Sequence, residues 1–216
     1  MTGHPAAAYF IGGAPRTGKT TLARRISQRT KLQSTNTDAV RSELRRSILQ
    51  TTEPDLYYLD SLNASESNMA RLMLDQTNDI IAAADRESKV VWKTVEAFVR
   101  TNVKAGHDIL VEGVAVLPEF IAKLDIPYSA VFLGNQSTGH AQIILEYAKT
   151  HPGTWLSKLS PSTIEAFAHF SNATSVHIEA ECKKYGLTYI DMDEKTYERQ
   201  LTFALSHLKQ SPNRTN

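Results

Sequence analysis

The sequence predicts an α/β fold, in which a five-stranded parallel sheet lies between helices on both faces and carries a small helical lid. Three observations lead to this prediction. Short apolar runs alternate with stretches of helical periodicity along the chain, as parallel strands joined by helical crossovers require. A glycine-rich turn directly follows the first apolar run, and acidic residues stand at or after several others. In such folds, ligands bind at the carboxyl ends of the strands.

Five short runs, each bounded by glycine or polar residues, are expected to form the strands: 9–11, 32–36, 109–111, 131–133 and 187–191. The run at 109–111 stands between Asp108 and Glu112 and contains no polar residue. That pattern is typical of a parallel strand that is buried on both faces.

Helices are expected between and after the strands. The first has Leu22, Ala23 and Ile26 on its inner side. In the second, apolar residues recur every four positions, which is the spacing of one helix face. Gly106 is expected to end the fourth. The remaining helices follow from the same periodicity, and after the first the expected ranges are 39–49, 64–84, 89–104, 139–149, 162–184 and 194–209.

Length and composition indicate one globular domain over residues 1–216, with a lid at about 140–161 and a polar tail at 211–216. The single cysteine, Cys182, excludes an internal disulfide framework and a cysteine-based zinc site. The longest apolar stretch, 6–14, is too short to span a bilayer. We therefore expect a cytoplasmic protein without a membrane partner.

Positive charge is concentrated near the beginning of the chain. The formal net charge is +1, yet residues 1–46 hold seven arginines and two lysines against Asp38 and Glu43. A concentration of positive charge attracts anions, so ligands that carry phosphate are expected. The alternative is that most of these arginines only solvate two helix faces. No run of five basic residues occurs, which argues against extended nucleic acid as a partner.

Residues 13–20 match the phosphate-binding (Walker A) pattern G-x-x-x-x-G-K-[ST] and lie between a predicted strand and a predicted helix. Backbone N–H groups of such a loop surround phosphate oxygens. Lys19 would reach the β- and γ-phosphates, and the Thr20 hydroxyl would bind Mg²⁺. Arg16 either contacts a phosphate or points to solvent. The predicted nucleotide-binding residues are Gly13, Ala14, Pro15, Arg16, Thr17, Gly18, Lys19, Thr20 and Thr21.

Three further residues complete the predicted site. Asp38 follows the second strand, where it would act as a general base on an acceptor hydroxyl. Arg41 lies one helical turn further and would hold an anionic group. The alternative for Asp38 is that it only caps the 39–49 helix. Glu112, at the end of a strand, would hold a metal-bound water or polarise the attacking group, or else it is a structural acid that pairs with Lys19 or a neighbouring backbone group.

With these residues, the chain resembles the small-molecule P-loop kinases of the nucleoside- and nucleotide-kinase-like branch, and it is most similar to 2-phosphoglycerate kinase-like proteins. The resemblance rests on GGAPRTGKTTLARRIS, TDAVRSELR and ILVEGVAVLPEF. It implies a P-loop NTPase fold, a mobile lid, and phosphoryl transfer that depends on ATP and Mg²⁺. It places Lys19 and Thr20 on the nucleotide and metal, and Asp38 and Arg41 on the substrate.

The expected function is transfer of the γ-phosphoryl group of ATP to a hydroxyl of a small-molecule acceptor, which would be anionic if Arg41 binds it. Such kinases usually have arginines in the lid, but no arginine occurs between Arg100 and Arg199. Lys149 and Lys158 are the lysines available there. Two alternatives remain open: a slow regulatory switch ATPase, and a kinase of nucleotide sugars or nucleic-acid ends. A homodimer is a further option.

Overall fold

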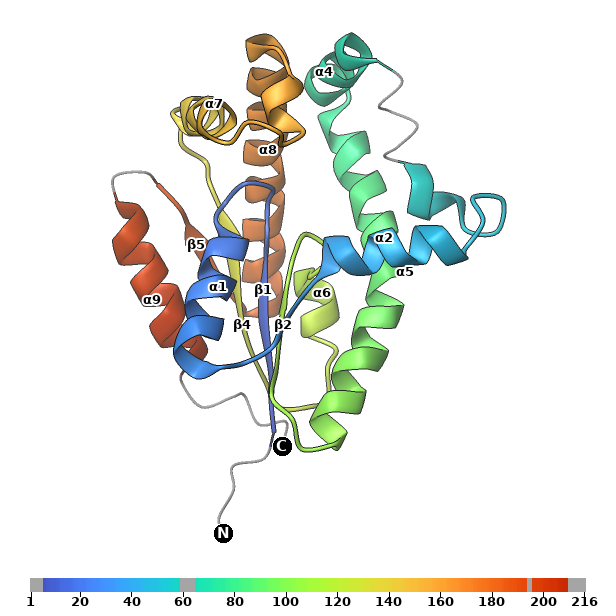
Figure 1. Cartoon of the computed structure of the whole chain (residues 1–216), viewed down its shortest axis with the longest axis vertical. Coiled ribbons are helices and arrows are strands. Elements are labelled where there is room, and N and C mark those ends of the chain that lie inside the picture. Colours follow the sequence, from blue (N-terminus) through green and yellow to red (C-terminus); the bar gives the residue numbers. More distant parts are fainter. Residues whose placement is uncertain (1–5, 59–64, 194–195, 210–216) are drawn as a thin grey trace.

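The computed structural model describes residues 6–58, 65–193 and 196–209, which form a five-stranded parallel sheet with helices on both faces (Figure 1). The strand order is β2-β3-β1-β4-β5, and all neighbouring pairs are parallel. The strands are β1 (Ala8–Gly13), β2 (Ser34–Asn36), β3 (Ile109–Glu112), β4 (Tyr128–Gly134) and β5 (Thr188–Asp191). The predicted fold class and all five strands are confirmed, although β1 and β4 are longer than predicted.

Eight α-helices and two short 3₁₀ turns are present in the described residues. The helices are α1 (Lys19–Thr30), α2 (Thr37–Ser47), α4 (Glu66–Asp75), α5 (Thr77–Lys104), α6 (Pro118–Ile121), α7 (His140–Thr150), α8 (Pro161–Tyr185) and α9 (Tyr197–Lys209). The 3₁₀ turns are η1 (Pro54–Tyr57) and η3 (Leu156–Lys158). The predicted tail at 211–216 lies outside the described residues.

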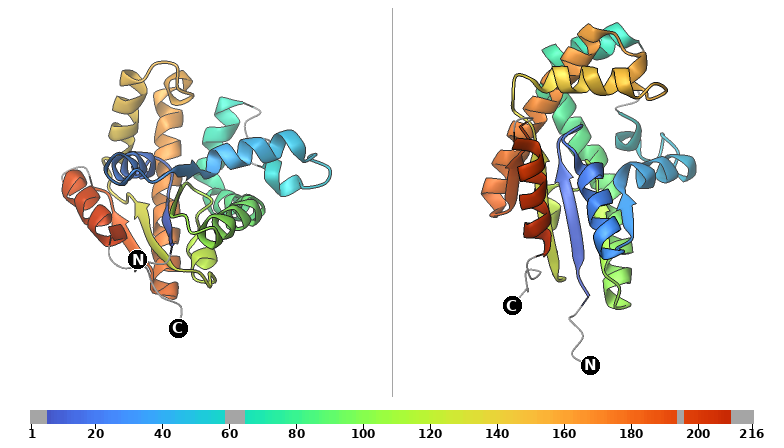
Figure 2. Two further views of the ribbon diagram at one scale, coloured as in Figure 1. Left: turned by 60° about the horizontal axis from the view of Figure 1, so that its bottom comes forward. Right: turned by 60° about the vertical axis from the view of Figure 1, so that its left-hand side comes forward.

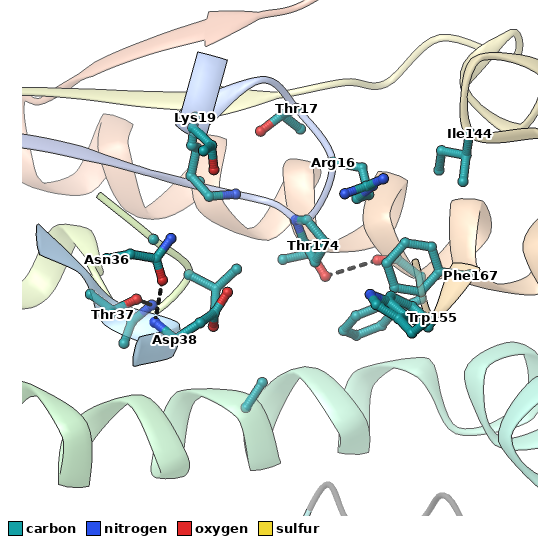
Figure 3. Close-up of a pocket in the computed structure, with 18 of the residues that line it drawn as sticks. Arg16, Thr17, Lys19, Asn36, Thr37, Asp38, Ile144, Trp155, Phe167 and Thr174 are labelled. Carbon is teal, nitrogen blue, oxygen red and sulfur yellow. Dashed lines mark hydrogen bonds between the residues drawn. The ribbon is translucent and has the colours of Figure 1, made fainter. Parts of the chain in front are cut away.

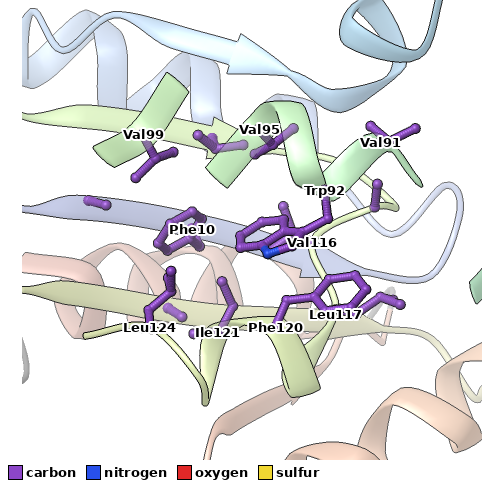
Figure 4. Packing of buried hydrophobic residues seen from close by; sticks show 14 of the residues in the cluster. Phe10, Val91, Trp92, Val95, Val99, Val116, Leu117, Phe120, Ile121 and Leu124 are labelled. Atoms are coloured by element: carbon purple, nitrogen blue, oxygen red, sulfur yellow. The ribbon is translucent and has the colours of Figure 1, made fainter. Parts of the chain in front are cut away.

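Two separate apolar cores lie against the two faces of the sheet, and the helices that cover these faces can be followed in Figure 2. Helices α5, α6 and α8 pack on one face, where Trp92 stacks on Phe120 and meets Phe10 with tilted rings (Figure 4). Cys182 of α8 is buried in the same core. Helices α1 and α9 cover the other face.

A third apolar cluster lies beyond the carboxyl ends of the strands. It joins α4 and the beginning of α5 to α7, η3 and the first half of α8, and Figure 1 shows these elements together at one end of the molecule. The expected lid, residues 140–161, comprises α7, η3 and the loops that connect them to α8. Its mobility stays a prediction.

One helix boundary was predicted wrongly. The sequence suggested separate helices at 64–84 and 89–104, but the break lies at Gln76 and α5 continues to Lys104. The side chains of Glu87 and Ser88 are buried within α5. Because these polar residues face the cavity described below, they interrupted the apolar pattern in the sequence without interrupting the helix.

Candidate active site

The phosphate loop, residues 13–20, connects β1 to α1 and has three left-handed backbone positions. Gly13 and Gly18 have φ of 123° and 96°, and Arg16 has φ of 61°. A Cβ atom at Gly13 would lie 2.0 Å from the carbonyl oxygen of Leu133, so only glycine fits there. The Thr17 hydroxyl donates to the Ala14 carbonyl oxygen at 2.8 Å, which fixes the turn from within.

Lys19 is a buried cation inside this loop. Only 7% of its surface is exposed, and its Nζ donates to the Ala14 carbonyl oxygen at 2.5 Å. Burial lowers the pKa of Lys19 to about 8, although the carboxylates of Glu112 and Asp38 act in the opposite direction. Both carboxylates therefore lie near enough to influence the ammonium group. An anion bound in the loop would compensate this desolvated charge.

Glu112, at the end of β3, contacts the first helical turn after the loop. Its Oε1 accepts hydrogen bonds from the Thr20 hydroxyl at 3.0 Å and from Asn36 Nδ2 at 2.5 Å. The expected alternative of a direct ion pair with Lys19 does not occur among the described residues. Mg²⁺ prefers oxygen ligands and usually takes only one or two from protein, together with phosphates. The hydroxyl of Thr20 and the carboxylate of Glu112 fit that requirement.

Asp38 does not cap a helix, so that alternative was wrong. The cap of α2 is Asn36, whose Oδ1 accepts from the backbone N–H groups of Asp38 at 2.6 Å and Ala39 at 3.3 Å. The Asp38 carboxylate is half exposed and lies 3.4 Å from Arg41. It is therefore free of the backbone and open to a ligand.

Arg41 and Arg45, both on α2, share a buried carboxylate on α5. The Oε1 atom of Glu87 lies 3.2 Å from Arg41 and 3.4 Å from Arg45. Glu87 is only 4% exposed. Both guanidinium groups also line the cavity, where they can donate hydrogen bonds to an anionic group of a substrate.

A single cavity of about 1270 Å³ connects these groups (Figure 3). Every predicted site residue except Ala14 lines it, and Ala14 contributes its carbonyl oxygen to the loop. The far wall is apolar and comes from α4, α5, the expected lid and α8. That wall includes Met69, Met73, Ile80, Ile81, Ile144, Trp155, Phe167 and Phe170.

The two alternatives for Arg16 need revision, because the guanidinium group does not point to solvent. Its central carbon lies 3.9 Å from the ring centroid of Tyr147 on α7, and its Nη2 atom is buried. Contact with a phosphate stays a prediction. Of the two lid lysines, Lys158 lines the cavity and Lys149 does not.

Asn36, Glu87 and Tyr147 are site residues that sequence reasoning missed. Asn36 lies directly before the predicted TDAVR segment, and its type is a common helix cap, so that signal was available. Glu87 and Tyr147 lie on long helices without a motif, and only the tertiary contacts reveal them.

These observations fix the fold. A five-stranded parallel sheet carries a phosphate loop between its central strand β1 and helix α1, as the resemblance implied. The chain has a P-loop α/β fold. No model of a known protein family matches the sequence.

Three named proteins show partial similarity to this chain. Over 126 residues, or 57% of this chain, the sequence is 30% identical to 2-phosphoglycerate kinase of Methanopyrus kandleri, and the match spans 37% of that protein. Shikimate kinase of Bacteroides thetaiotaomicron superposes with a TM-score of 0.48, 12% identity and coverage of 94% of this chain and 97% of that one. Dephospho-CoA kinase of Campylobacter jejuni superposes with a TM-score of 0.37 and 14% identity, and the match covers 92% of this chain and 95% of that one.

Two further findings concern other classes of site. None of the helices in the described part of the chain combines the length and apolar character that a bilayer crossing requires. Within the same residues, no three His, Cys, Asp or Glu side chains are grouped as metal ligands. The expected magnesium site at Thr20 and Glu112 stays a prediction.

Proposed function

We propose that this P-loop protein transfers the γ-phosphoryl group of ATP to a hydroxyl of a small-molecule acceptor, with Mg²⁺. The observation that carries the proposal is one cavity that joins the phosphate loop to Asp38, Arg41 and Arg45. A deep charged cavity opposite Lys19 accommodates a second substrate, whereas a switch protein would present a protein-binding face there.

The residues divide between nucleotide and acceptor. The loop amides and Lys19 hold the β- and γ-phosphates, and Asp38 accepts the proton of the attacking hydroxyl. Bound Mg²⁺ would neutralise charge on the transferred group, held through Thr20 and Glu112. Arg41 and Arg45 bind an anionic group of the acceptor, which orients the hydroxyl towards the γ-phosphate.

The relative from Methanopyrus kandleri supports an acceptor of this kind, because its name describes a kinase of a small phosphorylated acid. The chain matches about a third of that protein's length, so the identity of the acceptor is a separate proposal. A cytoplasmic location with ATP and free Mg²⁺ would suit this activity. No described feature favours the switch or the nucleic-acid-end alternatives.

The test is a screen of hydroxyl-bearing metabolites for ADP release that depends on the acceptor, carried out with the wild type and Lys19→Ala. We expect at least one small anionic acceptor to stimulate turnover in the wild type only. ADP release that no acceptor stimulates would instead indicate a slow ATPase.

Asp38→Asn is expected to lower kcat with that acceptor by roughly 10²–10⁴-fold, because a general base contributes that much. The affinity for ATP should change little, since Asp38 faces the acceptor side of the cavity. Steady-state kinetics and nucleotide titration separate the two quantities. Full turnover in this variant would exclude Asp38 as the base.

A further inference from the structure

Arg16 has an unusual position for an arginine. It lies within the phosphate loop at φ 61°, a backbone conformation that costs energy for any residue with a side chain. Its Nη2 atom is buried and has no hydrogen-bond partner among the described residues. A desolvated donor without an acceptor is also costly. Both features suit a group that awaits an anionic ligand.

Tyr147 fixes the direction of this guanidinium group. The central carbon of Arg16 lies 3.9 Å from the ring centroid of Tyr147. The ring of His151 stacks on the same tyrosine at 4.0 Å, with an angle of 8° between the planes. Since both neighbours lie at stacking distance, they occupy opposite faces of the ring. Tyr147 is thus held by its own helix while it supports Arg16.

Two of the other cavity arginines belong to the acceptor side in the proposed function. Arg41 and Arg45 both contact Glu87, and the segment 101–198 contains no arginine. Lys158 lines the cavity, but a lysine is a point charge that cannot grip two phosphate oxygens as a planar guanidinium group does. Arg16 is itself a residue of the phosphate loop, and it lines the same cavity.

We infer that Arg16 and Tyr147 form the binding site for the terminal phosphate of the nucleotide. Arg16 donates hydrogen bonds to its oxygens, and Tyr147 is the positioning residue that orients the guanidinium plane. The inference rests on the proposed function only in that the loop must bind a nucleoside triphosphate. It supplies from the loop the guanidinium group that the expected lid lacks.

The experiment compares two nucleotides that differ by one phosphate. Calorimetric titration with Mg²⁺ gives Kd for ADP and for AMPPNP, the ATP analogue with a bridging nitrogen, and the ratio of the two Kd values isolates the terminal phosphate. Arg16→Met keeps a side chain at the same backbone position. It is expected to lower the preference for AMPPNP by about 10- to 100-fold, the equivalent of a charge-assisted hydrogen bond, with the ADP affinity nearly unchanged.

Two variants of the tyrosine test the positioning role. Tyr147→Leu removes the aromatic face and should lower the same preference by about 3- to 10-fold, the range of a cation–π contact. Tyr147→Phe keeps that face and should retain the wild-type ratio. Lys149→Met is the matched control, because Lys149 is exposed on the same helix and lies outside the cavity.

The inference is overturned by a wild type that does not prefer AMPPNP, by an unchanged ratio in Arg16→Met, or by an equal loss of both affinities. If Arg16→Met does not fold, Arg16→Gly replaces it, because glycine accepts the positive φ without strain. An intact AMPPNP preference without acceptor phosphorylation would refute the proposed phosphotransferase and leave this site standing.

Discussion

At the scale of single residues, the site contains charged side chains that are buried from solvent. Lys19 is buried and has a lowered pKa, and Glu87 is buried between two arginines. Burying charge opposes folding unless a partner compensates it. The phosphate loop is therefore arranged for its ligand at some expense of stability in the empty protein.

Lys19→Met should consequently raise the free energy of unfolding of the ligand-free protein at pH 7, by about 3 kcal/mol. The pKa of Lys19 is about 8 in the folded state and lies near the usual lysine value of 10.5 in the unfolded chain. Between these values the unfolded chain binds more protons, so the wild type gains stability as pH rises. The difference between the variant and the wild type should shrink across that window. Urea unfolding from pH 7 to 10.5 measures it, and a constant difference would contradict the argument.

Asn36 and Asp38 offer a second test at this scale. Asn36→Ala removes the cap of α2 and should cost about 1–2 kcal/mol of unfolding free energy. Asp38→Ala leaves the cap in place, so its cost should stay below about 0.5 kcal/mol. The two variants are compared by urea unfolding under the same conditions. Equal costs would show that Asp38 contributes to capping after all.

At the scale of elements, the strands could be predicted because each buried one is an uninterrupted apolar run with a clear end. The helix boundary inside 64–104 could not be predicted. Glu87 and Ser88 are buried at the cavity, where Glu87 contacts α2. A local sequence pattern contains no information about such tertiary contacts. The phosphate loop was predictable because its residues are contiguous. The Arg16–Tyr147 contact joins residues 131 positions apart, so no spacing rule indicates it.

The continuity of α5 can be tested with proline. Lys89 is exposed in the interior of α5, so Lys89→Pro should cost about 3 kcal/mol or more, because proline removes a helical hydrogen bond and clashes with the preceding turn. Lys89→Ala at the same position should be nearly neutral. If a helix began near residue 89, as the sequence suggested, proline would be tolerated there. Denaturant unfolding of both variants decides between the two arrangements.

At the scale of the whole molecule, the cavity has a charged side and an apolar side. The charged side belongs to the sheet edge and α2, and the apolar side to α4, α5, the expected lid and α8. Trp155 in the loop after α7 is 50% exposed and meets Phe167 edge-on at 5.3 Å. The solvent exposure of a large aromatic side chain that is half exposed at a cavity is expected to change when a ligand binds there.

Trp155 should therefore report closure of the expected lid. The protein has two tryptophans, and Trp92 is buried against Phe120, so a Trp92→Phe variant isolates the signal of Trp155. Addition of AMPPNP and Mg²⁺ should shift its emission to shorter wavelength as the indole loses contact with water. Lys19→Ala serves as the control and should show no shift. An unchanged spectrum with saturating nucleotide would mean that residues 140–161 do not move over the cavity.

The buried position of Cys182 has a practical consequence for following such movement. The thiol is 1% exposed in the core beneath α8, and burial raises its pKa to about 12. Maleimide and methanethiosulfonate reagents react with thiolates, so they should leave the native chain unlabelled. A pair of cysteines introduced at exposed sites, one on α7 at Lys149 and one on α2 at Arg46, could then carry spin labels without first removing the natural one. Pulsed electron resonance between such labels would measure distances across the cavity mouth in a protein whose own sulfur chemistry stays silent.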